Sequence, residues 1–219
     1  MGIGHFGIAL IAKRAEPALS LGTVALAAML ADFVCFILLI AGIEHFSNVP
    51  GARLNLMFGD HIVWSHSLLM DATWGAIFAA IFFAIRRAAK GAWILFACVV
   101  SHWILDVISH RPDMALAPGT EARLGFELWN SFPATLAVEG GFWLLAIIVY
   151  VRSTKAKSVP GAIAFWVGAS LLTLISLVNL RAGIDQSPVR AGIGGLIVFS
   201  IFVAWAYWMN RARAFKQTA

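Results

Sequence analysis

The stretch SHWILDVISHRPDMALAP, residues 101–118, begins with an apolar run that contains two histidines and an aspartate at regular spacing. His102, Asp106 and His110 stand at positions i, i+4 and i+8. On a helix each fourth residue advances only about 40° around the axis, so the three side chains are predicted to form one stripe. Two imidazoles flanking a carboxylate at this spacing can bind a metal ion from consecutive turns. The alternative interpretation is a helix end that carries a few satisfied polar residues.

The composition indicates that a lipid bilayer surrounds this stripe. Hydrophobic residues make up 61% of the 219 residues and charged residues only 12%, whereas soluble domains average about 25% charged residues. The chain is therefore predicted to be an all-α integral membrane protein. Cys35 and Cys98 lie in apolar runs without metal or redox spacing, so we interpret them as core residues. The net charge of +5 follows membrane topology and does not indicate a nucleic-acid partner.

Six apolar runs approach or exceed the length of a transmembrane helix, which takes roughly 17–25 residues. They cover residues 18–43, 61–85, 91–108, 132–151, 161–180 and 191–209. A shorter run, residues 2–12, is predicted to form a half-membrane helix whose buried N-terminus carries His5 to mid-depth. We treat residues 1–219 as one transmembrane domain, with site-bearing helices in 1–151 and two accessory helices in 152–219.

The basic residues predict how the bundle is oriented. Loops on one side hold 11 of the 16 Lys and Arg residues, and loops on the other side hold 5. By the positive-inside rule both chain ends are predicted to be cytoplasmic, and loops 44–60 and 109–131 face outward. On this topology the polar site lies in the outer half of the bundle.

Acids and imidazoles from five segments converge at one predicted depth, between the membrane midplane and the outer surface. Ionisable groups are costly at this depth and usually have a function. Nitrogen and carboxylate ligands without thiolate suit one or two divalent ions, with zinc expected first and manganese or iron(II) as alternatives. The predicted metal ligands are His5, Asp32, His66, His102, Asp106, His110 and Glu139.

Other polar residues are interpreted as supporting or surface groups. Asp71 follows His66 by five residues, about 140° around a helix, so both helix pairing and assistance to catalysis stay open for it. His45 and His61 lie beside predicted loop ends and are interpreted as surface residues. A role for His61 as partner of a ligand also stays open.

The loop after the stripe joins Arg111 and Arg123 to Trp129 at the predicted membrane surface. Arginine can bind a phosphate through two parallel hydrogen bonds, and tryptophan favours the membrane interface. One interpretation makes these three residues a substrate-binding cap for an anionic, lipid-like molecule. The other makes the segment an ordinary interfacial loop.

Four motifs together carry a resemblance to a family. They are GHFGIAL at 4–10, an acid in the next helix, WSHSLL at 64–69 and SHWILDVIS at 101–109. The combination resembles the YdjM-like membrane-bound metal-dependent hydrolases, which are similar in turn to zinc-dependent phospholipase C and the zinc single-strand nucleases. The resemblance covers about residues 1–120, together with LWNSFPATLAVEGG at 128–141. Where the family pattern has a second acid after Asp32, this chain has Val34.

The resemblance implies a bacterial inner-membrane location and a defined set of ligands. One metal site is built from Asp32, His66, His102 and Asp106. His5 would join a second ion bridged by Asp106. A further pair, His110 and Glu139, also matches the pattern.

Three functions follow from these residues. The first is a metal-dependent hydrolase of a phosphoester, such as a lipid or isoprenoid phosphate, in which a metal-bound hydroxide attacks and Asp106, Asp71 or Glu139 assists. The second is an ion- or proton-coupled transporter, which inverted repeats or paired broken helices would indicate. The third is a non-catalytic bundle with a structural metal, which a closed four-ligand site would indicate. Membrane lipids are the expected partners in all three.

Overall fold

Six apolar segments of spanning length surround a shorter N-terminal helix. The structure, a computed structural model, describes residues 2–48, 56–57, 61–182 and 187–216. Five of its helical segments are long and apolar enough to cross a membrane, and a bent pair of shorter helices makes a sixth. The predicted all-α membrane fold is therefore confirmed. The spans are α2 with α3 (Leu21–Ala28 and Leu30–Ile40), α4 (Leu68–Arg86), α5 (Ala89–Ser109), α6 to α7 (Phe132–Ser153), α8 (Val159–Ala182) and α9 (Pro188–Ala212).

The first span is broken at Met29, where the chain bends by 56° between α2 and α3. A regular helix would pair the carbonyl of Ala28 with the amide of Asp32. At the break this carbonyl instead accepts a hydrogen bond of 2.8 Å from Nδ1 of His102. Asp32 then lies in the first turn of α3, where the helix dipole favours a carboxylate. The break thus positions two residues of the predicted site: it frees a carbonyl that orients His102, and it places Asp32 at the start of a helix.

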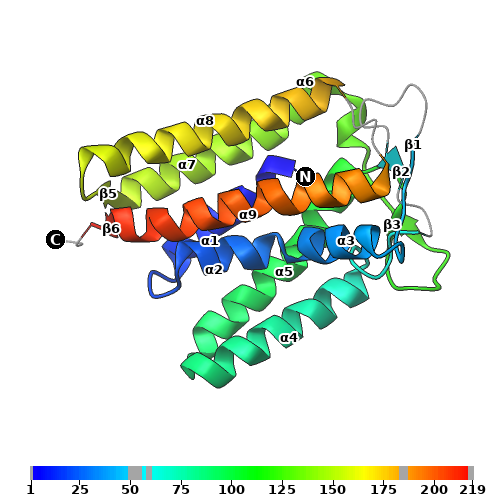
Figure 1. The fold of residues 1–219 in the computed structure, drawn as a ribbon, viewed down its shortest axis with the longest axis horizontal. Helices are drawn as coiled ribbons and strands as arrows, with labels where there is room; N and C mark the ends of the chain where they lie inside the picture. Colours follow the sequence, from blue (N-terminus) through cyan, green and yellow to red (C-terminus); the bar gives the residue numbers. More distant parts are fainter. Residues whose placement is uncertain (1, 49–55, 58–60, 183–186, 217–219) are drawn as a thin grey trace.

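The N-terminal helix α1 (Gly2–Ala15) lies inside the bundle, where α2, α5 and α7 pack around it (Figure 1). Its 14 residues span about 21 Å, less than the roughly 30 Å of a hydrocarbon core. At its end Lys13 is buried, and its Nζ donates to the carbonyls of Pro17 and Leu19. His5 is buried in the N-terminal part of the helix, as the half-membrane prediction requires.

Helix α9 lies between α8 and the broken span in Figure 1. It packs closely on α3 because two glycines face Phe36. A Cβ atom on Gly192 would lie 2.8 Å from the Phe36 carbonyl oxygen, and one on Gly195 would lie 2.4 Å from its ring. Small residues of this kind let membrane helices approach each other.

Short antiparallel strand pairs lie at the two ends of the bundle. At one end of the bundle β1 (Ser47–Asn48) pairs with β2 (Leu56–Met57), and β3 (Met114–Ala115) pairs with β4 (Arg123–Leu124). At the other end β5 (Thr154–Ala156) pairs with β6 (Arg213–Phe215), with Lys155 opposite Ala214. A 3₁₀ turn, η1 (Leu128–Asn130), leads into α6 (Phe132–Thr135), the π-helical η2 (Leu136–Gly140) and α7 (Gly141–Ser153).

One helix boundary differs from the prediction. Helix α4 begins only at Leu68, with Ser67 as its N-cap, so His61 and His66 precede the helix instead of lying on it. The angle between His66 and Asp71, which assumed one continuous helix, is therefore wrong. Helix α5 ends at Ser109, close to the predicted end at residue 108. His110 is its C-cap, and its amide still donates 2.7 Å to the Asp106 carbonyl, so the third residue of the predicted stripe lies where the backbone leaves the helix.

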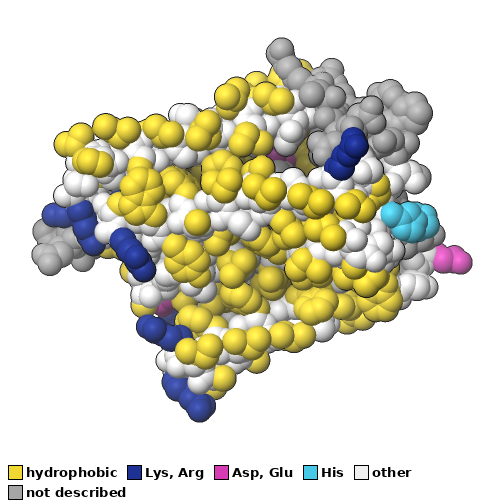
Figure 2. Space-filling model, in the orientation of Figure 1, with side chains coloured by type: hydrophobic (Ala, Val, Ile, Leu, Met, Phe, Trp, Pro, Cys, Tyr) yellow, Lys and Arg dark blue, Asp and Glu magenta, His cyan; other side chains and the backbone are white. Residues whose placement is uncertain are grey.

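The exterior of the helix bundle has the composition expected of a protein embedded in a membrane. Figure 2 shows a broad apolar belt over the middle of the bundle, with most of the visible Lys and Arg side chains at the end that carries β5 and β6. Large apolar side chains are exposed along α8 and α9, including Ile197 at 56%. This surface would be covered by hydrocarbon in a bilayer.

Candidate metal centre

Two histidines and two aspartates from three separate segments face one another inside the bundle. Nε2 of His66 lies 3.6 Å from Oδ1 of Asp32 and 4.0 Å from Oδ2 of Asp106. Nε2 of His102 lies 3.6 Å from Oδ2 of Asp32 and 3.4 Å from Oδ2 of Asp106. The two histidines and Asp106 are buried, whereas the Asp32 side chain is 20% exposed. We call these four residues the central cluster.

The hydrogen bond from His102 to the Ala28 carbonyl fixes which ring nitrogen of His102 faces the carboxylates. Because Nδ1 donates the proton, a neutral ring has its lone pair on Nε2, which points at the carboxylates. Carboxylates are also acceptors, and Nε2 of His102 has no hydrogen-bond partner among the described residues. Two acceptors that face each other repel. Either a proton or a metal ion on Nε2 of His102 would remove this repulsion between its lone pair and the carboxylate oxygens. A backbone carbonyl behind a metal-binding histidine is a common arrangement.

His66 is oriented by two residues that the sequence analysis did not single out. Nδ1 of His66 lies 2.8 Å from Oγ of Ser65, and this hydroxyl donates to Oε2 of Glu44 at 2.6 Å. Glu44 is fully buried, and its Oε1 accepts the amide protons of Trp64 and Ser65 at 2.8 and 2.9 Å. With Ser65 donating to Glu44, its oxygen accepts from His66 Nδ1. Nε2 of His66 is thereby left to face the cluster.

His5 adds a third imidazole. Its Nε2 lies 3.1 Å from Oδ1 of Asp106, and its ring stacks on that of His102 with centroids 3.7 Å apart. Asp106 thus contacts His5 through one oxygen and the central cluster through the other. This is the position of a carboxylate that could bridge two ions.

The spacing of these atoms fits a divalent ion. Ligand atoms bound tetrahedrally to zinc at roughly 2.0–2.2 Å lie about 3.3–3.6 Å apart, and three of the four distances in the central cluster are 3.4–3.6 Å. Two groups of three ligand atoms lie within 4.8 Å of one another. They are His5, Asp32 and His102, and His66, His102 and Asp106.

The cluster opens onto a cavity of about 400 Å³. Its polar end includes His5, Asp32, His66 and Asp106, and side chains of α3, α8 and α9 form its apolar walls. In Figure 2 a hollow between α8 and α9 shows an acidic side chain in its depth. The cavity therefore gives a substrate or water access to the candidate ligands.

His110 and Glu139 lie beside the cluster without joining either group of three. Nδ1 of His110 lies 3.3 Å from Oδ1 of Asp113, and the His110 ring lies 4.5 Å from that of Trp129. Oε1 of Glu139 accepts 2.6 Å from the indole of Trp129 and 3.4 Å from Ser109. Both His110 and Trp129 line the cavity. Their predicted roles as ligand and substrate contact stay predictions.

The remaining predicted residues are not among those that line the cavity. Asp71 is fully buried, and its Oδ2 accepts 3.1 Å from the backbone amide of Trp103. Arg123 donates to the carbonyls of Thr120 and Ala122 in its own loop. Arg111 precedes the β3–β4 hairpin. Their predicted parts in catalysis and substrate binding are not tested by these contacts.

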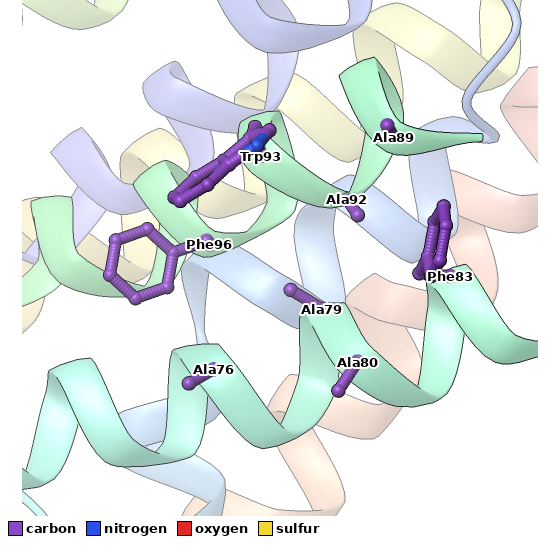
Figure 3. Close-up of a pocket in the computed structure, with 8 residues that line it drawn as sticks. All are labelled: Ala76, Ala79, Ala80, Phe83, Ala89, Ala92, Trp93 and Phe96. Atoms are coloured by element: carbon purple, nitrogen blue, oxygen red, sulfur yellow. The ribbon is translucent and has the colours of Figure 1, made fainter. Parts of the chain in front are cut away.

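Two further features help to delimit the site. His45 and His61 are exposed and stack on each other with centroids 3.9 Å apart, as their interpretation as surface residues expects. A second pocket, between α4 and α5, is lined only by alanines and by Phe83, Trp93 and Phe96 (Figure 3). Its lining contains no titratable side chain, and the indole N–H of Trp93 is its one polar side-chain group.

Comparison with known families agrees with the arrangement of these residues along the chain. The sequence profile of the YdjM inner membrane protein family matches residues 1–184, which contain every residue of the central cluster. The chain belongs to this family. No curated protein and no solved structure matches it. Membership of the YdjM family confirms the family resemblance and agrees with integration into an inner membrane.

Proposed function

We propose that this YdjM family member is a metal-dependent hydrolase embedded in the membrane, acting on a phosphoester of a lipid-like molecule. The observation that carries the proposal is the central cluster, in which two imidazole nitrogens face two carboxylates at the spacing of zinc ligands. Asp32, His66, His102 and Asp106 would hold the ion, and His5 would contribute to a second one through Asp106. Zinc is the expected ion, with manganese or iron as alternatives.

A bound divalent ion would supply Lewis acidity and lower the pKa of a coordinated water towards neutrality. The residues of the chain orient and shield this chemistry. Ser65 and Glu44 hold His66, and the Ala28 carbonyl holds His102, so neither ring has to reorganise during the reaction. Asp32, the most exposed member of the cluster, faces the cavity from which a substrate would arrive.

The cavity favours an enzyme over a purely structural metal site. A structural zinc site is closed by four protein ligands, whereas this cluster borders a cavity of about 400 Å³. The broken span α2–α3 is the one observation that favours the second candidate, an ion-coupled transporter, because such helices form ion sites in transporters. Among the described residues it is the only break of this kind, and no paired break accompanies it.

Elemental analysis of the detergent-purified protein tests the proposal first. We expect one or two equivalents of metal in the wild type, and less than a tenth of that in His102→Ala and Asp106→Ala. His45→Ala, which removes an exposed imidazole outside the cluster, is the matched control and should keep the wild-type metal content. Protein that contains no metal and takes none up from added zinc or manganese would overturn the hydrolase proposal.

Metal-loaded protein should then hydrolyse a phosphomonoester or phosphodiester in detergent micelles. The two cluster variants should reduce the rate at least about 100-fold, because they remove ligands of the ion. A different result would favour the transporter: the protein binds metal stoichiometrically, releases no phosphate, and transports a solute when an ion gradient is applied.

A further inference from the structure

The cavity joins two chemically different halves. Besides the candidate ligands, its lining consists largely of apolar and small residues, among them Phe36 and Leu39 of α3 and Val198 and Phe199 of α9. Ile175 and Asn179 of α8 complete the wall, and Ile175 is 37% exposed. A charged end and an apolar wall in one cavity match an amphiphile with a polar head and a hydrocarbon chain.

The cavity opens sideways because α8 and α9 separate along their length. Near the β5–β6 end they are joined by Trp205, whose indole donates 3.0 Å to the Ala164 carbonyl and whose ring stacks on Phe165. The cavity wall comes instead from residues 175–179 of α8 and 191–199 of α9, beyond this contact. Figure 1 shows the two helices diverging there, and Figure 2 shows the hollow between them.

Both helices are candidate membrane spans, so an opening between them faces hydrocarbon and not water. Gly194 lies at this opening. It lines the cavity, it is exposed, and a Cβ atom on it would meet nothing within 4 Å. A side chain at this position would project into the space that a hydrocarbon chain would use.

We propose that a single hydrocarbon chain of a membrane lipid enters the cavity laterally between α8 and α9 and places its phosphate head group at the central cluster. The inference rests on the proposed function for the identity of the head group. A chain moving from bilayer to cavity exchanges one apolar surrounding for another and gains little hydrophobic free energy. The groove therefore acts by orienting the lipid so that its phosphoester reaches the cluster. A volume of about 400 Å³ is near the lower end of small-molecule sites and suits one chain.

Photocrosslinking with hexadecyl phosphate that carries a diazirine at the end of its chain tests the groove. In wild-type protein we expect labelled peptides from residues 175–179 and 191–199. Gly194→Phe should reduce this labelling at least fivefold. Gly141→Phe is the matched control, because Gly141 is also exposed on a spanning helix with open space around its Cβ position but does not line the cavity. Ile175→Trp narrows the opening from the α8 side and should act like Gly194→Phe.

The same experiment separates this inference from the proposed function. In the metal-site variant His102→Ala the chain should still label α8 and α9, because the groove does not depend on the ion. Protein that binds metal and hydrolyses phosphoesters, but is labelled evenly over all lipid-facing helices, would overturn the groove and leave the hydrolase standing. Labelling of the groove in protein that binds no metal would overturn the hydrolase proposal and leave the lipid groove standing. Size-exclusion profiles like that of the wild type establish that each variant is folded.

Discussion

At the scale of single residues, the orientation of the two central imidazoles decides what the site can do. His66 and His102 both have Nδ1 engaged, one by a serine and the other by a backbone carbonyl, and both turn Nε2 towards Asp32 and Asp106. A neutral imidazole facing a carboxylate through its lone pair is unfavourable without a cation between them. The contacts behind the two rings therefore contribute to metal binding in addition to the ligands themselves.

Removing the serine behind His66 should weaken metal binding without removing a ligand. We expect Ser65→Ala to reduce zinc affinity by about 10–100-fold, since His66 loses the acceptor that orients its ring. Competition with a chelator of known affinity measures the change. The control is Ser101→Ala, next to His102, where the hydroxyl donates to the Cys98 carbonyl of its own helix. Equal affinities in both variants would contradict an orienting role for Ser65.

The sequence predicts part of this arrangement. His102 and Asp106 were predictable because their i, i+4 spacing survives in α5. His110, the third residue of the predicted stripe, is the C-cap of α5: its amide still donates to the Asp106 carbonyl, and Pro112 follows two residues later. Glu44 resembles a solvated acid at the end of an apolar run, and only the fold shows that it is fully buried behind Ser65.

At the scale of elements, the broken span is the feature that sequence reasoning could not supply. Residues 24–32, VALAAMLAD, contain neither glycine nor proline and are mostly good helix formers. The break instead accompanies a tertiary contact, the hydrogen bond from His102 to the Ala28 carbonyl. The six apolar runs themselves were predictable, since the requirement for internal backbone hydrogen bonds in lipid leaves helices as the solution.

The contact between α3 and α9 should be sensitive to a single methyl group. We expect Gly192→Ala to destabilise the protein by about 1–3 kcal/mol, because its Cβ would lie 2.8 Å from the Phe36 carbonyl oxygen, which cannot move without the helix. Thermal unfolding in detergent measures the loss. Gly194→Ala on the same helix adds a methyl group in open space and should be close to neutral. Equal melting temperatures for the two variants would contradict this packing.

The connection between α1 and α2 should carry a small pH dependence. Nζ of Lys90, at the start of α5, donates 2.8 Å to Glu16, and this hydrogen bond lowers the pKa of the Glu16 carboxyl below its usual 4.5. A lowered folded-state pKa means that the pair contributes stability above the unfolded pKa of 4.5 and loses it as pH falls through the folded value.

Melting temperatures of the wild type and Glu16→Gln should therefore differ slightly at pH 7 and converge below about pH 4. The effect is small because the ammonium group is largely exposed. Lys90→Met should give the same small loss at pH 7. A difference between wild type and Glu16→Gln that persists unchanged at pH 3 would show that another interaction of Glu16 is responsible.

At the scale of the whole molecule, the number of spans fixes which ends share a side. Six crossings with a buried half-helix at the start place residue 15 and the C-terminal strand β6 at the same end of the bundle, where β5 also lies. The 11-to-5 distribution of Lys and Arg predicts that this end is cytoplasmic, and the central cluster then lies nearer the outer surface.

Cysteine accessibility in intact cells tests this orientation, and the native Cys35 and Cys98 give little background because both are buried. We expect Glu121→Cys, exposed in the outward loop, to react with a membrane-impermeant maleimide in intact cells. Lys157→Cys, exposed between β5 and α8, should react only after the membrane is permeabilised. The opposite labelling pattern would show that the protein has the opposite orientation in the membrane, with the central cluster nearer the cytoplasm. The groove between α8 and α9 would keep its access to the bilayer, because an opening between two spans faces hydrocarbon in either orientation.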